Sequence, residues 1–142
     1  MTGYVLDTSV VMAWCFEDEA NHYADAVLDS LAEGGALTPS IWPLEVGNVL
    51  VVAERRERIS IADSERFLEL LRQLPIEVEF SSEQCLFGAV LNLAREQELS
   101  TYDAAYLNLA MRTGLPLATL DQELRKAANR CGVTIFQELH NW

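Results

Sequence analysis

The sequence predicts an α/β domain built on a parallel sheet. Short apolar segments alternate with longer segments whose apolar residues recur at helical spacing, a pattern typical of parallel strands joined by right-handed crossovers. The first apolar segment, Tyr4-Val5-Leu6, shows no polar alternation, so we expect a strand buried on both faces in the middle of the sheet. Asp7 follows this strand directly and is therefore expected at the carboxyl edge, where such sheets carry their chemistry.

The composition is that of a folded domain. The chain has 142 residues, half of them apolar, with a mean hydropathy of +0.07, and we expect one domain over residues 1–142. No apolar run approaches the ~20 residues of a membrane span, and no basic segment precedes an apolar one as in a secretion signal. Cys15, Cys85 and Cys131 lack a metal-type spacing, which favours reduced thiols and a cytoplasmic location.

The charge is strongly acidic. Ten basic and 22 acidic residues give a net charge of −12, and Lys126 is the only lysine. A surface of this sign repels phosphate backbones, so charge alone argues against a nucleic-acid partner. Either the charge serves solubility, or part of it is concentrated in a metal site and part attracts a basic protein partner.

Turn residues bound the elements that follow the first strand. Residues 10–16 form a short apolar helix, and the acidic residues 17–19 open a second helix with charges that favour its N-terminal dipole. Gly34 and Gly35 end this helix. Residues 36–38 form the second strand, which the following proline ends.

The middle of the chain contains two helices and a strand. Pro43 suits the first turn of a helix and places Glu45 within that turn. Ser60 and Asp63 have the spacing of a capping box that starts the next helix. Residues 76–80 alternate between apolar and acidic side chains, so we expect a strand at the edge of the sheet with one exposed face.

The last third repeats the alternation of helix and strand. A helix is predicted over residues 81–94, and Ser100 starts the next one, which Gly114 ends. Residues 117–120 form a strand that ends at Asp121. A short helix opens there, and residues 133–136 form the last strand.

Four acidic residues lie where a strand ends or a helix begins: Asp7, Glu45, Asp103 and Asp121. In a parallel α/β sheet these places share one edge, so we expect the four carboxylates to converge. Their mutual repulsion should raise at least one pKa, and helix N-termini offset it by only ~0.3–1 kcal/mol each. A divalent cation is a far better counter-charge. Oxygen ligands favour Mg²⁺ or Mn²⁺, and such an ion supports phosphodiester chemistry by ionising a water.

Each acid also has an ordinary structural explanation. Asp103 can complete a capping box with Ser100, and Asp121 can be a helix N-cap. Glu45 can serve only the dipole of its helix, and Asp7 can cap the helix that follows the first strand. On this view the protein is a non-catalytic binding module.

The sequence lacks the residues that other kinds of active site require. A phosphoacceptor receiver-like domain also clusters acids at a sheet edge, but it needs a lysine there, and Lys126 lies inside a predicted helix. The two histidines, His22 and His140, are not at the carboxyl end of a predicted strand. The sequence contains neither a GxSxG elbow nor a GxxxxGK[ST] loop.

Four segments in this order resemble the PIN domain family, and specifically VapC-type toxins: residues 5–10, 39–50, 99–106 and 117–121. The resemblance implies a three-layer α/β/α sandwich with a five-stranded parallel sheet and Mg²⁺- or Mn²⁺-dependent endoribonuclease activity. It implies that Asp7 and Asp103 hold the metal directly, while Glu45 and Asp121 hold it through water or position the attacking water. Three neighbouring hydroxyl residues either orient water or substrate or only cap the backbone: Thr8, Ser9 and Thr119.

The resemblance also implies partners. Toxins of this type cleave RNA, form homodimers and are held inactive by a cognate antitoxin that places a basic side chain near the acids. Four apolar residues are candidates for a groove that receives the antitoxin, or are simply core: Trp14, Phe16, Trp42 and Leu50. The basic cluster at residues 55–58 either guides RNA or stabilises a helix end.

Overall fold

The computed structural model describes residues 3–19 and 21–137. The strands in these ranges are β1 (Tyr4–Leu6), β2 (Ala36–Pro39), β3 (Ile76–Glu79) and β4 (Leu117–Ala118). The helices are α1 (Thr8–Cys15), α2 (His22–Gly34), α3 (Trp42–Arg55), α4 (Ile61–Arg72), α5 (Glu83–Cys85), α6 (Leu91–Gln97), α7 (Thr101–Thr113) and α8 (Gln122–Arg130). A 3₁₀ turn, η1 (Glu17–Glu19), follows α1, and a π-helical turn, η2 (Leu86–Val90), joins α5 to α6.

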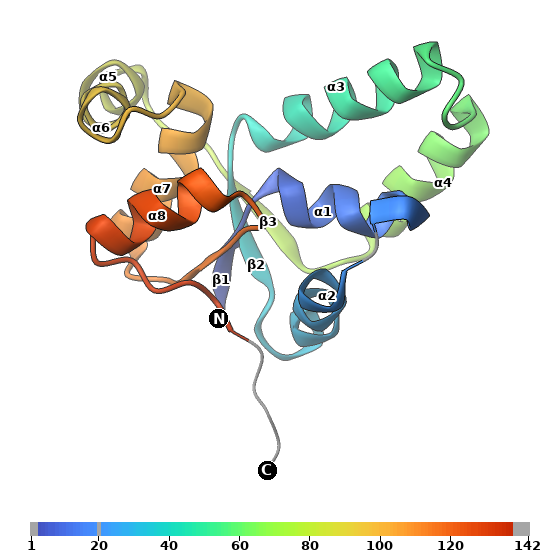
Figure 1. The fold of residues 1–142 in the computed structure, drawn as a ribbon, viewed down its shortest axis with the longest axis horizontal. Helices are drawn as coiled ribbons and strands as arrows, with labels where there is room; N and C mark the ends of the chain where they lie inside the picture. The colour runs from blue at the N-terminus through green and yellow to red at the C-terminus, as the bar shows by residue number, and fades with distance from the viewer. Residues whose placement is uncertain (1–2, 20, 138–142) are drawn as a thin grey trace.

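The sheet is parallel, with the strand order β3-β2-β1-β4. All three residues of β1 are buried, and β3 forms an edge with partly exposed side chains, as the sequence predicted for both. Figure 1 shows α1 to α4 on one side of the sheet and α5 to α8 on the other. The predicted α/β fold with a parallel sheet between two layers of helices is therefore confirmed.

The prediction of five strands is wrong for the described residues. Residues 133–136 pass beside β4, but they form only an isolated parallel bridge between Leu117 and Ile135. The Leu117 amide donates to the Thr134 carbonyl at 2.9 Å, and the Phe136 amide donates to the Leu117 carbonyl at 2.8 Å. Because β4 is only two residues long, it offers too short an edge for a longer ladder.

The order of the strands reverses direction between β1 and β4. The chain runs outward from β1 through β2 to β3 and then returns to place β4 on the other side of β1. The helices that follow β1 and β4 consequently leave toward opposite faces of the sheet (Figure 1). Ligands of open α/β sheets bind at such a switch point, between the ends of the two strands.

The candidate antitoxin groove is mostly core. Phe16, Trp42 and Leu50 are 3%, 8% and 2% exposed, and Trp14 is half-buried with its indole N–H donating to the Ala24 carbonyl at 2.7 Å. These side chains fill the space between the helices that cover one face of the sheet, so they are not available as a surface. The three cysteines are unpaired and pack against the same core. No helix in the described part of the chain is long and apolar enough to cross a membrane.

The helix predicted over residues 81–94 is interrupted. Ser82 rather than Ser81 caps its start, with its Oγ accepting from the Cys85 amide at 3.1 Å. The backbone then widens into η2, which contains Gly88 and continues directly into α6. A π-helical turn inserts one residue into a helix without breaking it, and the apolar spacing of the sequence does not reveal such an insertion.

Candidate functional site

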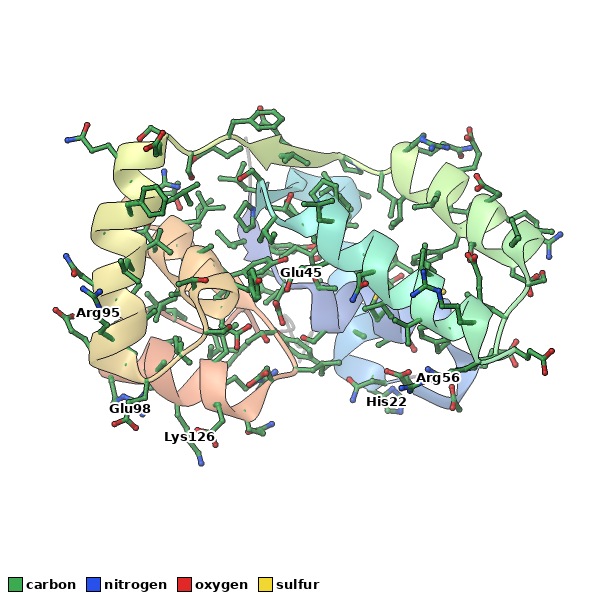
Figure 2. All side chains as sticks on the ribbon, turned by 90° about the horizontal axis from the view of Figure 1, so that it is seen from above. His22, Glu45, Arg56, Arg95, Glu98 and Lys126 are labelled. Atoms are coloured by element: carbon green, nitrogen blue, oxygen red, sulfur yellow. The ribbon has the colours of Figure 1, made fainter. Side chains whose placement is uncertain are left out.

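The structure brings the four predicted acids to the carboxyl edge of the sheet. Asp7 is the N-cap of α1, and Asp121 is the N-cap of α8. Glu45 lies in the first turn of α3, and Asp103 lies in the first turn of α7. Figure 2 looks down on this edge, with Glu45 near the middle of the view, between the two groups of helices.

The charges of the four carboxylates act on one another. Burial, followed in order by the negative charges of Asp7, Asp121 and Glu45, raises the pKa of Asp103 from 3.8 to about 6. Burial is also the main cause that raises the pKa of Asp7, with a smaller contribution from the charge of Asp121. The pKa of Glu45 is raised by burial and then by the charge of Asp7, against the lowering effect of its hydrogen bonds. The acids therefore form one electrostatically coupled group.

Hydroxyl groups hold one oxygen of Asp7, which is only 5% exposed. Its Oδ2 accepts from Ser9 Oγ at 2.6 Å, from Thr119 Oγ1 at 2.8 Å and, at the longer distance of 3.4 Å, from the Ser9 amide. Ser9 Oγ accepts from the Leu120 amide at 2.9 Å, and Thr119 Oγ1 accepts from the Asp121 amide at 3.1 Å. These bonds tie the end of β1 to the segment that follows β4. The side chains of Ser9 and Thr119 therefore orient the Asp7 carboxylate and also bind backbone amides.

Glu45 is held in the same way, by a residue that the sequence did not single out. Its Oε1 accepts from Tyr106 Oη at 2.5 Å and from Thr8 Oγ1 at 3.1 Å, and the two hydroxyl oxygens are 2.7 Å apart. Burial and the adjacent Glu45 carboxylate raise the pKa of Tyr106 well above its ordinary range, so it remains a hydroxyl donor. The signal was its position three residues after Asp103, which places both side chains on one face of the helix.

Asp103 does not complete a capping box. In α4 the Ser60 Oγ accepts from the Asp63 amide at 3.0 Å, and the Asp63 carboxylate accepts in return from the Ser60 amide at 3.1 Å. In α7 only the first half of this motif forms, with Ser100 Oγ accepting from the Asp103 amide at 3.1 Å. No hydrogen bond to the Asp103 carboxylate is found within residues 3–19 and 21–137, so the capping explanation is wrong for this acid. It is correct for Asp121, which accepts from the Leu124 amide at 3.0 Å.

The hydrogen bonds leave oxygens available on every acid. Within the described residues, no protein donor reaches Asp7 Oδ1, Glu45 Oε2, Asp121 Oδ2 or either oxygen of Asp103. Among these residues, no three carboxylate, imidazole or thiol side chains are close enough together to surround an ion directly. This donor set fits Mg²⁺ or Mn²⁺, because Mg²⁺ is usually held by one or two carboxylates and keeps several waters.

Lys126 and His22 lie away from the four acids. Lys126 is exposed on α8 and pairs with Glu123 at 3.4 Å, so it does not supply the lysine of a phosphoacceptor site. Figure 2 shows Lys126 and His22 at the periphery of the molecule, well away from Glu45 in that view. The second histidine, His140, lies outside the described residues.

The basic cluster at the end of α3 is also peripheral. Arg56 lies about 16 Å from Glu45 along the helix axis, and Figure 2 shows it toward the lower right edge of the molecule. Arg58 forms ion pairs within the fold, with its Nη2 2.7 Å from both Asp18 Oδ1 and Glu19 Oε2. Its guanidinium also lies over the Phe16 ring, 3.9 Å from the ring centroid. This arginine therefore fastens η1 to the end of α3.

Comparisons with known proteins agree with this geometry. No curated protein matches the chain significantly. The crystal structure of PAE2754 from Pyrobaculum aerophilum is similar, with a TM-score of 0.69 and 26% sequence identity over 89% of this chain and 86% of that chain. The family model described as "PIN domain" matches residues 4–130, a range that contains all four acids and the strands that position them. With its parallel sheet and its coupled acids at the carboxyl edge, the chain belongs to the PIN domain family, whose members are generally metal-dependent nucleases.

Proposed function

We propose that this protein is a metal-dependent endoribonuclease of the VapC type, the toxin of a type II toxin–antitoxin module that acts in the cytoplasm. Residues 1–142 form one PIN-like domain on this proposal. The observation that carries it is the group of four coupled acids, whose free oxygens exceed what capping and helix dipoles require. The family supports the nuclease activity, and the acidic site supports its dependence on a cation.

The four acids have distinct roles in this proposal. Asp7 and Asp103 hold the ion directly, since Asp7 has one oxygen and Asp103 two without a protein donor in the described residues. Glu45 and Asp121 act through water, either holding the ion's hydration shell or orienting the attacking water. When bound, Mg²⁺ or Mn²⁺ supplies positive charge, ionises a water near neutral pH and stabilises charge on the phosphate.

The cation also accounts for how an acidic protein acts on RNA. The net charge of −12 repels a phosphate backbone at long range, and the four carboxylates repel it most strongly where cleavage occurs. A divalent ion reduces this negative charge and presents a positive centre to a phosphate oxygen at that point alone. We therefore expect that RNA binding, as well as RNA cleavage, requires the ion.

The test of activity uses a substrate without ends. A circular single-stranded RNA is cut only by an endonuclease, and we expect cleavage with Mg²⁺ or Mn²⁺ that EDTA abolishes. Asp103→Asn should reduce the rate about 100-fold or more, because it removes a charge that holds the ion. Asp63→Asn is the matched control, since this aspartate occupies the same position after a helix-capping serine but is remote from the site. An unchanged rate in Asp103→Asn, or no cleavage by the wild type with either ion, would overturn the proposal.

The toxin role predicts a cellular effect that depends on the same residue. Expression of the wild type should arrest growth, while Asp103→Asn should not, and co-expression of the cognate antitoxin should restore growth. A strongly acidic toxin suits an antitoxin that carries basic side chains. Growth arrest by both proteins would show toxicity that does not come from the acidic site.

The proposal includes a homodimer, and an exposed apolar groove supports it. The groove encloses about 410 Å³ between the start of α3, η2 and the start of α7. Leu44, Phe87 and Tyr102 line it and are 71%, 71% and 57% exposed, an unusual concentration for a surface without a partner. Homodimer interfaces are more apolar than the rest of a protein surface, so we place a second copy of the chain here.

Sedimentation tests this placement. Phe87→Glu should shift the protein from dimer to monomer, because it places a charge in the apolar contact. Ile61→Glu, at a position of similar exposure (68%) on α4, should leave the dimer intact. A monomeric wild type, or a dimer that tolerates Phe87→Glu, would contradict the placement.

A further inference from the structure

We propose that Tyr106 is a positioning residue that acts through Glu45. Together with Thr8 it fixes one carboxylate oxygen and thereby directs the other toward the hydrated metal ion. The inference rests on the proposed function, because it assigns Tyr106 a role in holding the ion.

The geometry is that of three groups with two protons. Tyr106 Oη is 2.5 Å from Glu45 Oε1, which lies within the range of a hydroxyl that donates to an ionised carboxylate. Thr8 Oγ1 lies 3.1 Å from the same oxygen and 2.7 Å from Tyr106 Oη. Tyr106 donates its hydrogen bond to Glu45 Oε1, whether the Thr8 hydroxyl donates to the same oxygen or to Tyr106 Oη. Both hydroxyls approach the same oxygen, and within the described residues none approaches Oε2.

The three residues come from different parts of the fold. Tyr106 lies on α7, which covers one face of the sheet, whereas Thr8 and Glu45 lie on α1 and α3, which cover the other. The Tyr106 side chain is completely buried and Thr8 is 8% exposed, so packing fixes both hydroxyls. Glu45 is only partly buried at the start of its helix, and these two bonds are the ones that restrain its carboxylate.

The same arrangement recurs at the neighbouring acid. Ser9 and Thr119 hold Asp7 Oδ2 and leave Oδ1 without a protein donor among the described residues. Two carboxylates of the site are thus each held through one oxygen by a pair of hydroxyls. Groups that orient metal ligands in this way typically change metal affinity or activity 10–100-fold when removed.

A second buried tyrosine provides the matched control. Tyr4 is 2% exposed, and its hydroxyl donates to the Val27 carbonyl at 2.8 Å and accepts from Ser30 at 3.1 Å. It lies at the opposite end of β1 from Asp7. Tyr106→Phe and Tyr4→Phe therefore remove the same group from the core and leave the ring in place, but only the first removes it from Glu45.

The readout is Mn²⁺ binding to the full chain in the absence of RNA, measured by titration calorimetry. We expect Tyr106→Phe to weaken Mn²⁺ binding about 10-fold, while Tyr4→Phe changes it by less than about two-fold. Thr8→Val, which removes the second hydroxyl at nearly constant volume, should weaken it in the same direction and serves if Tyr106→Phe does not fold. The inference would be overturned if the folded variants at positions 8 and 106 bound Mn²⁺ with the same affinity as the wild type.

A double-mutant cycle identifies the route of the effect. If Tyr106 acts through Glu45, adding Tyr106→Phe to Glu45→Gln should weaken Mn²⁺ binding no further than Glu45→Gln does alone. A full additional loss would mean that the tyrosine acts by another route and would overturn the assignment. Absence of Mn²⁺ binding by the wild type would instead refute the metal site itself, and with it the proposed function.

Discussion

Replacing Asp103 with Asn should stabilise the protein when no metal is present. The pKa of Asp103 is about 6 in the folded protein against an ordinary value of 3.8, so the folded state holds this proton more tightly than the unfolded state does. The charged form therefore destabilises the fold. This cost is absent below about pH 3, grows as the pH rises through the unfolded pKa, and is complete above about pH 6.

The magnitude follows from this difference in pKa. A rise from 3.8 to about 6 corresponds to about 3 kcal/mol for a fully buried group. The side chain is only partly buried, so solvent screening reduces this to about 1.5 kcal/mol. Loss of the favourable interaction with the N-terminus of α7 removes about 0.5 kcal/mol more. The net gain for Asp103→Asn is about 1 kcal/mol, or about 3 °C in the unfolding temperature of a chain of this size.

Urea unfolding in EDTA at pH 8 and pH 4 measures this gain. The difference between Asp103→Asn and the wild type should be present at pH 8 and largely lost at pH 4. Asp63→Asn should behave in the opposite way, since hydrogen bonds from Ser60 lower the pKa of Asp63 and its charged form stabilises the helix start. That variant should be less stable than the wild type at pH 8.

Addition of Mn²⁺ should reverse the order of stability. A ligand that binds the folded state stabilises it in proportion to the logarithm of its concentration above Kd, and only the wild type should gain fully. If Asp103→Asn were no more stable than the wild type at pH 8 without metal, the burial of this charge and its repulsion by the other acids would together be too weak to demand a cation. The central argument for the site would then be wrong.

Two further substitutions test the contacts that build the site and the sheet. Thr119→Val should lower the free energy of unfolding in urea by about 1–3 kcal/mol, because the buried Asp7 carboxylate loses a donor. Thr119→Ser should retain most of the stability, and equal stabilities of the Val and Ser variants would contradict the assigned bond. Gly35→Ala should destabilise more than Gly114→Ala in thermal unfolding, although both glycines have a φ of +70°. A Cβ at position 35 would lie 2.7 Å from the Pro75 carbonyl oxygen, while position 114 has open space and should cost about 1–2 kcal/mol; equal losses would contradict this.

Local signals in the sequence located the acids well. Pro43 correctly placed Glu45 in the first turn of its helix, and the uninterrupted apolar run before Asp7 correctly indicated the central strand. Both features depend on a few neighbouring residues, so the sequence alone can predict them. The convergence of the acids on one edge then followed from the general geometry of parallel sheets.

The errors arose where distant residues decide the local structure. The pattern Ser-x-x-Asp occurs at 60–63 and at 100–103, yet only the first forms the complete capping box. The local sequence is equivalent, so the difference comes from the tertiary surroundings of Asp103, which include three other carboxylates. Tyr106 was overlooked for a related reason: its spacing gives its helical face but not the glutamate that it meets across the sheet.

The π-helical turn η2 determines which side chains face the apolar groove. One residue in an α-helix corresponds to a rotation of about 100°, so an inserted residue turns everything before it relative to everything after it. Leu86 and Phe87 line the groove with exposed side chains, while Val90, at the end of the same turn, lines it from the buried side. Shortening this turn by a single position would rotate the two exposed side chains away from the surface they now form. A length change of one residue would therefore reshape this apolar surface without changing the acids.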